Sequence, residues 1–253
     1  MKTVRNTSTI FQRYFGLSIS NPFYMGVSLV QPLLYLMLFA PLLKSMANMP
    51  GFPGGGAYNV FVPGLLIQLG LFSVTSAGWS LIAEVRAGII ERMRVTPVNR
   101  SALLLGRTLR DIAMLLVQAA LIVLAAIPFG LSVHLPGLLL AFALVALIAL
   151  LMASVSYGVA LLIRDENAFG AIVFSATLPL LLLSGVLLPM SLAPTWLQAV
   201  SSLNPLRYAV DAERALFVNH VASSVVTEGF VILGALALAA IGGASRAFNK
   251  AVA

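Results

Sequence analysis

The chain has 253 residues, of which 60% are hydrophobic and only 9% are charged. A soluble domain carries about 25% charged residues and must cover itself with polar surface in water, so this composition excludes a soluble enzyme domain. The net charge of +7 is therefore attributed to membrane topology, because Lys and Arg collect on the cytoplasmic side, and not to nucleic-acid binding. Cysteine is absent, which excludes disulfides and thiolate metal sites.

The first twenty residues predict a helix that lies in the membrane interface. Arg13 interrupts the apolar pattern, and the short apolar core and cleavage site of a signal peptide are missing. Apolar and aromatic residues recur at i, i+1, i+4 and i+5, at Ile10, Phe11, Tyr14 and Phe15. The pattern predicts an amphipathic helix over residues 8–20, with Arg13 towards the lipid head groups.

Six apolar stretches follow, each close to the 20 or so residues that cross a bilayer. They cover residues 23–43, 60–83, 112–131, 138–163, 168–188 and 225–244. We therefore predict an all-α polytopic membrane protein with six transmembrane helices. With the N-terminus inside, 12 of the 15 Lys and Arg residues lie on the inner side, so both termini are predicted to be cytoplasmic.

Two local spacings within these stretches leave alternatives open. Arg107 and Asp111, at the inner edge of the third span, are spaced i,i+4 and either pair or form a solvated helix start. Ala235, Ala239 and Gly243 form a stripe of small residues on the last span. That stripe either permits close helix packing or only reflects the abundance of alanine.

The sequence carries no motif for an energy source or a metal. A GxxxxGK[ST] phosphate loop, an HExxH pair and a GxSxG nucleophile elbow are all missing from the sequence. The two histidines, His134 and His220, lack the spacing of metal ligands. No predicted span has an ionisable residue at its centre, where an ion-coupled carrier usually has one. These features indicate a membrane pathway that depends on a partner for energy.

The inner segment between the second and third spans predicts an amphipathic helix over residues 84–97. Val85, Ile89 and Met93 repeat every four residues, charged residues occupy most of the remaining surface, and Pro97 ends the pattern. We expect the charged face to point to the cytoplasm. The mixed charge favours a protein partner, whereas the alternative is a basic loop whose arginines contact lipid phosphate.

The outer segment after the fifth span predicts short helices. Trp196, Leu197, Val200 and Leu203 have the spacing of an interfacial helix, and Asn204 and Pro205 are suited to begin a second one. Asp211 and Arg214 are spaced i,i+3 and are placed to pair. The alternative is an outer loop on the surface without a gating role.

Both segments resemble the permeases of ABC type-2 exporters, in the branch of the daunorubicin-resistance and nodulation types. The inner motif comprises Gly88, Ile89, Ile90, Glu91, Arg92, Met93, Pro97 and Arg100, where many members have Thr or Ser at the position of Ile89. The outer motif comprises Ser184, Gly185, Pro189, Pro194, Trp196, Leu197, Asn204, Pro205, Tyr208, Asp211 and Arg214. The resemblance implies that residues 1–253 form a single transmembrane domain.

The resemblance also implies roles for these residues. The inner helix would be a coupling helix that docks on an ATPase through Glu84, Arg86, Gly88, Glu91, Arg92, Met93, Arg94, Pro97 and Arg100. Residues 189–217 would form re-entrant outer helices, with outer-gate residues Ser184, Gly185, Pro189, Pro194, Trp196, Asn204, Pro205, Tyr208, Asp211 and Arg214. Polar and aromatic candidates for the substrate path are Gln68, Ser73, Thr75, Phe174, Ser175 and Thr177.

The implied function is that of a permease subunit in a bacterial plasma membrane. It would export a hydrophobic or amphipathic substrate, with no catalytic or metal site and no cofactor of its own. Two ATP-binding-cassette subunits would hold ATP and Mg²⁺, and a second permease copy or a homologue would complete the complex within the lipid. The alternatives are an ion-coupled secondary carrier and a non-transport membrane scaffold.

Overall fold

The computed structural model describes residues 2–20, 22–46, 56–88, 100–187 and 189–252. All regular structure within these ranges is helical, so the all-α prediction is confirmed for them. The α-helices are α1 Lys2–Ile19, α2 Pro22–Met46, α3 Ala57–Arg86, α5 Arg100–Ala126, α6 Leu135–Ile163, α7 Glu166–Leu183, α8 Thr195–Ser201, α9 Pro205–Phe217 and α10 Ser224–Val252. Two short 3-10 helices, η1 Ile127–Phe129 and η2 Met190–Leu192, follow α5 and α7.

Five of the described helices are long and apolar enough to cross a membrane. These candidate spans are Ala57–Arg86, Leu105–Phe129, Leu135–Ile163, Glu166–Leu183 and Ser224–Ala247. The first predicted span, residues 23–43, falls in the 25-residue α2, whose described part contributes the shorter apolar stretch Leu29–Phe39. The prediction of a polytopic membrane protein is thus confirmed. The predicted number of six spans is supported by the five candidate helices together with this apolar stretch of α2.

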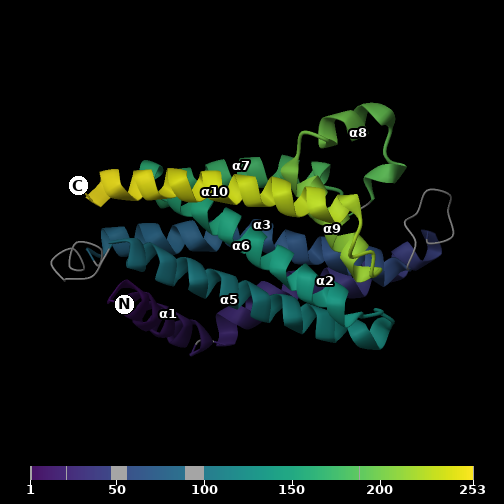
Figure 1. Ribbon diagram of the computed structural model, residues 1–253, viewed down its shortest axis with the longest axis horizontal. Helices are drawn as coiled ribbons and strands as arrows, with labels where there is room; N and C mark the ends of the chain where they lie inside the picture. Colours follow the sequence, from purple (N-terminus) through teal and green to yellow (C-terminus); the bar gives the residue numbers. More distant parts are fainter. Residues whose placement is uncertain (1, 21, 47–55, 89–99, 188, 253) are drawn as a thin grey trace.

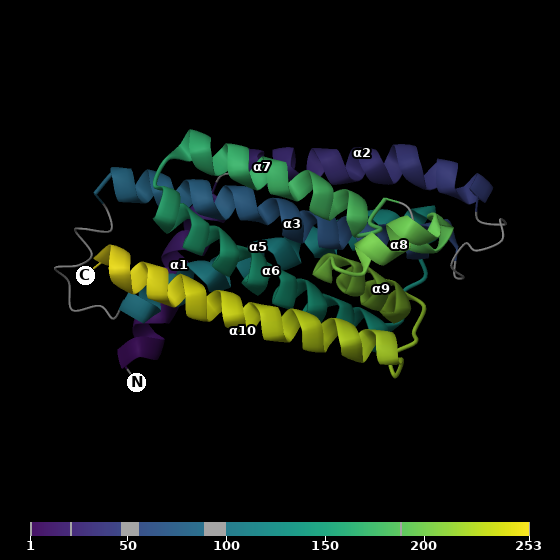
Figure 2. The ribbon, with the colours of Figure 1, turned by 90° about the horizontal axis from the view of Figure 1, so that it is seen from above.

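The long helices run side by side, and the two ends of the bundle differ (Figure 1). Both chain termini lie at one end, together with the last turn of α3 and the beginning of α7, whereas α8 and α9 lie towards the other end. Helix α1 crosses the long axis of the bundle at the end that carries the termini (Figure 2). This is the orientation expected of a helix that lies along a membrane surface.

Helix α3 is the centre of the bundle. It contacts α2, α5, α6, α7 and α9, and every residue from Ala57 to Leu71 is buried. A helix that is apolar all round is expected to be buried in this way. Glycines allow the neighbours to approach closely, because an added Cβ at Gly64 would lie 2.5 Å from the carbonyl oxygen of Val186.

Helix α10 packs through a face other than the small-residue stripe noted in the sequence. Ala235, Ala239 and Gly243 are exposed, and nothing described lies within 4 Å of a Cβ added at Gly243. The packed face instead includes Leu233 and Gly229, where an added Cβ would lie 2.6 Å from the Cβ of Ala212 on α9. The close-packing interpretation of the stripe is therefore wrong within this chain.

Candidate functional site

At the end of the bundle that carries the termini, five side chains form a connected polar group, which we call the inner polar cluster. Glu84 of α3 accepts hydrogen bonds from Tyr14 of α1, at 2.9 Å, and from Arg107 of α5, at 2.5 Å. Asp111 of α5 accepts a hydrogen bond from the hydroxyl of Tyr157 on α6. The cluster therefore connects four helices around the last turn of α3.

The pairing within the cluster differs from the one suggested by the sequence. Arg107 pairs with Glu84 across two helices, and Asp111 pairs with Arg110 at 2.7 Å, so Arg107 and Asp111 form neither an i,i+4 pair nor a solvated helix start. Arg107 is only 8% exposed, and a buried charge requires such partners. Its guanidinium also lies 5.1 Å from the ring centroid of Tyr14 and 5.7 Å from that of Tyr157.

The close approach of α1 to α5 places Tyr14 in this cluster. A Cβ at Gly106 would lie 2.6 Å from the side chain of Ile10, so only a glycine lets the two helices pack at this distance. Burial raises the pKa of the Tyr14 hydroxyl, which Arg107 partly opposes. The hydroxyl therefore stays protonated and donates to Glu84.

The predicted coupling helix does not begin as a separate element at Glu84. Helix α3 continues to Arg86, and the chain then turns at Ala87 and Gly88, where Gly88 has φ +66° in the left-handed region. Glu84 and Arg86 thus belong to the last turn of α3. The carboxylate of Glu84 is not free to dock on a partner, because Tyr14 and Arg107 occupy it.

Arg86 makes a second connection from the last turn of α3. Its guanidinium pairs with Asp165 at 3.0 Å and with Glu166 at 3.4 Å, at the turn between α6 and α7. The indole of Trp79 donates to the carbonyl oxygen of Glu166 at 3.2 Å. Asp165 also accepts from the backbone N–H of Ala168, which together with Arg86 lowers the pKa of the Asp165 carboxyl.

The remaining predicted coupling residues fall where the structure gives no side-chain description. Glu91, Arg92, Met93, Arg94 and Pro97 lie outside the described residues. Arg100 begins α5, and its side chain is likewise outside the description. The last turn of α3, just before residues 89–99, is held in place by two residues. Glu84 contacts α1 and α5, and Arg86 contacts the turn between α6 and α7.

At the opposite end, Arg214 of α9 organises the predicted outer-gate segment. Its side chain donates to the carbonyl oxygens of Val60 at 3.0 Å and Gly185 at 2.7 Å. The expected pairing with Asp211 is present at 3.8 Å. Burial lowers the pKa of Arg214 to about 10, so the guanidinium remains charged at neutral pH. Arg214 therefore ties α9 to the start of α3 and to the end of α7.

The local structure of the outer segment follows the predicted signals. The side chain of Asn204 caps α9 by accepting from the N–H of Leu206 at 3.0 Å, and Pro205 takes the first helical position. The amide of Asn204 also donates to the carbonyl oxygen of Leu180 at 2.7 Å. The remaining outer-gate residues do not share one environment. Ser184 and Pro189 are buried, whereas Pro194 and Trp196 are exposed, Trp196 by 66%. Tyr208 donates to the carbonyl oxygen of Ser202 at 3.0 Å.

Glu213 is a buried acidic residue on α9 that the sequence motifs did not single out. Neither carboxylate oxygen has a hydrogen-bond partner among the described residues. Burial raises the pKa of the Glu213 carboxyl well above its ordinary value of 4.5. Burial therefore favours the protonated, uncharged form of this side chain. In the sequence, the feature that could have identified Glu213 is its position as an acidic residue on the apolar side of α9.

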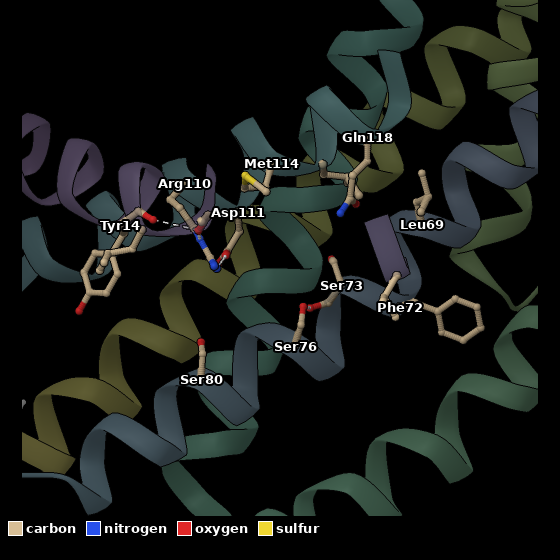
Figure 3. A pocket seen from close by; sticks show the side chains of 14 residues that line it. Tyr14, Leu69, Phe72, Ser73, Ser76, Ser80, Arg110, Asp111, Met114 and Gln118 are labelled. Carbon is tan, nitrogen blue, oxygen red and sulfur yellow. Dashed lines mark hydrogen bonds and ion pairs between the residues drawn. The ribbon is translucent and has the colours of Figure 1, made fainter. Parts of the chain in front are cut away.

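A cavity of about 600 Å³ lies between α1, α2, α3 and α5, near the inner polar cluster (Figure 3). Three serines follow one face of α3, opposite α5. Its polar lining consists of Tyr14, Ser18, Ser73, Ser76, Ser80, Arg110, Asp111 and Gln118. The sequence analysis named only Ser73 among these three serines. Their spacing at i, i+3 and i+7 places them on one face of a helix and is the signal that could have identified all three.

The other predicted path residues do not line this cavity. Gln68 is buried in α3, and its amide has no partner among the described residues. Thr75 is half-buried, Thr177 is buried, and Phe174 and Ser175 are exposed on α7. Within the described residues, the structure does not gather the six candidates into one route.

Comparison with protein families decides the class of this protein. The model of the ABC-2 type transporter family matches residues 5–218. The chain belongs to the ABC-2 type transporter family. Among similar proteins is one named as the transport permease ycf38 of Cyanophora paradoxa, which is 27% identical over 218 residues, 85% of this chain and 74% of that protein. The same-named protein of Porphyra purpurea is 26% identical over 219 residues, 85% of this chain and 75% of the relative.

A further relative of the ABC-2 chain is named for drug resistance. It is the daunorubicin resistance ABC transporter permease protein DrrB1 of Streptomyces coeruleorubidus, 23% identical over 198 residues, 74% of this chain and 66% of the relative. The chain is therefore the multi-pass membrane subunit of an ABC transporter, and the family implies an ATP-binding-cassette partner. Among the described residues of this ABC-2 permease, no group of three His, Cys, Asp or Glu side chains is placed to hold a metal ion.

Proposed function

We propose that this chain is the permease subunit of an ATP-driven exporter for hydrophobic or amphipathic molecules. The observation that carries the proposal is the family match over residues 5–218, and the outward direction is supported by the daunorubicin-resistance relative. ATP and Mg²⁺ would be held by two copies of a separate ATP-binding subunit. A second copy of this chain, or a homologous permease, would complete the translocation path.

The topology proposed is that of a plasma-membrane protein of bacterial type with both termini in the cytoplasm. Twelve of the 15 basic residues lie on the predicted inner side. The end of the bundle with both termini also carries the last turn of α3, including Arg86. This end would face the ATP-binding subunits, and α8 and α9 would lie near the outer surface.

The contacts of α3 support a mechanism for coupling. A force applied to residues 89–97 by an ATP-binding subunit would reach the last turn of α3, because Glu84 and Arg86 lie just before that segment. From there it would pass through Glu84 to α1 and α5, and through Arg86 to the α6–α7 turn. At the outer end, Arg214 joins the start of α3 to α9 and Gly185, so a shift of α3 would move the outer-gate segment.

Charge reversal in the predicted coupling helix tests the proposal. The variants are Glu91→Arg, and Arg92→Glu together with Arg94→Glu, each co-expressed with the candidate ATP-binding subunit. We expect both variants to lose stimulation of ATP hydrolysis and binding of that subunit, while remaining in the membrane at the wild-type level. Arg246→Glu, an exposed position on the same predicted side, is the matched control. Stimulation and binding that survive both reversals would show that the coupling assignment is wrong.

One observation favours a different energy source. A proton-coupled carrier needs an ionisable group away from water, and the buried Glu213 is such a group. The two functions are separated by measuring transport in proteoliposomes. An exporter of the proposed type needs internal ATP and is indifferent to the proton gradient, whereas the carrier needs the gradient alone. A chain that stimulates no ATPase and transports nothing would be a scaffold.

A further inference from the structure

The charged residues that line the cavity between α1, α2, α3 and α5 lie at one end, and apolar and uncharged polar side chains line the rest of its length. Its volume of about 600 Å³ falls in the usual range for sites of small organic ligands. The polar end lies at Ser18 and Arg110, next to the inner polar cluster. Leu69, Phe72 and Met114 supply apolar lining further along α3 and α5 (Figure 3). This distribution of side chains matches an amphiphile better than a uniformly apolar or uniformly polar molecule.

The cavity is elongated along the helices. Its lining on α3 runs from Ser80 to Leu69, which at 1.5 Å per residue corresponds to roughly 16 Å. On α5 the lining runs in the same direction, from Arg110 to Gln118. A molecule with a linear apolar chain fits this shape, with its head group at the polar end.

Arg110 provides the positive charge in the cavity lining. Its Nε donates to the hydroxyl oxygen of Ser18 at 2.7 Å, and its Nη1 donates to Asp111 at 2.7 Å. Guanidinium carries five N–H donors, and its Nη2 has no partner among the described residues. The side chain is 30% exposed, so these remaining donors are accessible to an anion from the cavity.

The three serines of α3 and Asp111 do not offer a second site for an anion. Ser73, Ser76 and Ser80 each donate their hydroxyl proton to a carbonyl oxygen of α3, at 2.6, 3.0 and 2.8 Å. The oxygens of these serines therefore remain only as acceptors, which repel an anion, and that of Ser80 already accepts from Arg107 at 3.4 Å. Asp111 is already occupied by Arg110 and Tyr157. A single anionic group is thus directed to Arg110.

The rim of the cavity is accessible from the side of the bundle. Leu17 of α1 is 62% exposed and Val27 of α2 is 54% exposed, and both line the cavity. Helix α1 crosses the bundle at the end that carries the termini. Under the proposed topology, the polar end of the cavity lies at the level of the inner lipid head groups, so an amphiphile reaches it from the inner leaflet.

We propose that this cavity binds an amphiphile with one anionic head group, held by Arg110, and an apolar chain that lies along Leu69, Phe72 and Met114. That the bound amphiphile is then exported rests on the proposed function. The head group is a phosphate monoester or a free carboxylate of the kind found in lipids, and free phosphate shares the same chemistry at Arg110 alone.

Photocrosslinking tests the binding directly. The full chain in phosphatidylcholine nanodiscs is exposed to a monoacyl lysophosphatidate with a diazirine in its chain, or to the monoacylglycerol with the same chain. We expect the anionic probe to crosslink to α3 and α5 within the cavity, and to be captured roughly tenfold better than the neutral probe, because one charge-assisted hydrogen-bonding group is involved. Millimolar inorganic phosphate should compete weakly, because it lacks the chain.

Two variants and two controls separate binding from folding. Arg110→Gln should lower capture of the anionic probe roughly tenfold and leave the neutral probe unchanged. Ser76→Phe fills the cavity without altering Arg110 and should lower capture of both probes. The controls, Arg246→Gln and Ala239→Phe, change exposed residues of α10 and should retain wild-type capture.

The outcomes distinguish this inference from the proposed function. Equal capture of the two probes, no effect of Arg110→Gln, or complete displacement by inorganic phosphate would each overturn the amphiphile site. A decrease in capture when ATP is added before irradiation, measured with the co-expressed ATP-binding subunit, would establish that the site loads cargo. If capture is as expected but no ATPase associates with the chain, the proposed function fails while the site stands. If ATPase coupling is intact and capture is absent, only the site fails.

Discussion

The guanidinium of Arg107 on α5 lies 2.5 Å from the carboxylate of Glu84 in the last turn of α3. Glu84 is four residues before Gly88, where the described part of this segment ends. The two side chains are 10% and 18% exposed, so the pair is largely shielded from water. A shielded pair of this kind fixes the position of the helix end, because breaking it leaves a charge without its partner.

Removing either partner of this pair should destabilise the protein. Glu84→Ala and Arg107→Ala are each expected to lower the free energy of unfolding by about 2 kcal/mol, since the remaining charged group loses a charge-assisted hydrogen bond. The double variant should cost less than the sum of the single variants. Thermal unfolding of the purified chain in detergent measures the three differences.

Two further variants control this comparison. Glu228→Gln changes an exposed residue of α10 and should alter stability by less than about 0.5 kcal/mol. Exchange of the charges, Glu84→Arg with Arg107→Glu, should recover part of the loss. If the exchanged pair is no better than either single change, direct pairing does not explain the contribution of these residues.

Glycines in the long helices should respond to substitution in opposite directions. Gly64→Ala places a methyl group 2.5 Å from the backbone oxygen of Val186, which forces α3 away from the outer segment and should cost about 1–3 kcal/mol. Gly234→Ala on α10 meets nothing described within 4 Å, and should stabilise by about 0.5–1 kcal/mol through helix propensity. Unfolding midpoints of the two variants give the comparison. Similar effects of the two changes would mean that the close approach at Gly64 is not maintained.

Stability should fall as pH rises, in part because of Glu213. Burial raises the pKa of this carboxyl above its unfolded value of 4.5, so between the two values the folded chain binds the proton and the unfolded chain does not. The free energy of unfolding therefore decreases as pH rises above 4.5, by up to about 1.4 kcal/mol per pH unit. Burial also raises the pKa of Asp211, which Arg214 and Arg207 oppose, so Asp211 adds a slope of the same sign.

Glu213→Gln should remove the part of this slope that belongs to Glu213. The amide is neutral at every pH, so the variant should gain stability relative to wild type from pH 5 to pH 8. Unfolding midpoints across this range measure the difference. Parallel profiles for the two proteins would mean that Glu213 is not held protonated in the folded state.

The local features of the outer segment were predictable because neighbouring residues determine them. Asn204 caps α9 with its own side chain, and Pro205 follows at the first helical position. The i,i+3 spacing of Asp211 and Arg214 placed them within reach of each other. No sequence pattern, however, indicated that Arg214 would donate to the backbone of Val60, which is 154 residues away.

The candidate site was predictable only in part, for a related physical reason. Arg107 and Asp111 were recognisable as a charged pair at a helix start, but the partners of each depend on which helices pack beside α5. Those neighbours bring Glu84, Tyr14 and Tyr157 to the cluster from three other helices. Of the three serines on α3, the sequence analysis named only Ser73, because whether a serine faces a cavity or a packed helix is set by packing alone.

The sequence by itself determined the fold class of this protein, an all-α membrane protein with several spans. Apolar length sets the helices and local motifs mark the inner and outer segments, because these signals act over a few turns of one helix. The distribution of basic residues over the whole chain predicts the orientation. Only the tertiary structure decided which charges are neutralised, which face of α10 packs, and where the cavity opens. These depend on contacts between helices distant in the chain, and shape complementarity selects such contacts among many that are equally apolar.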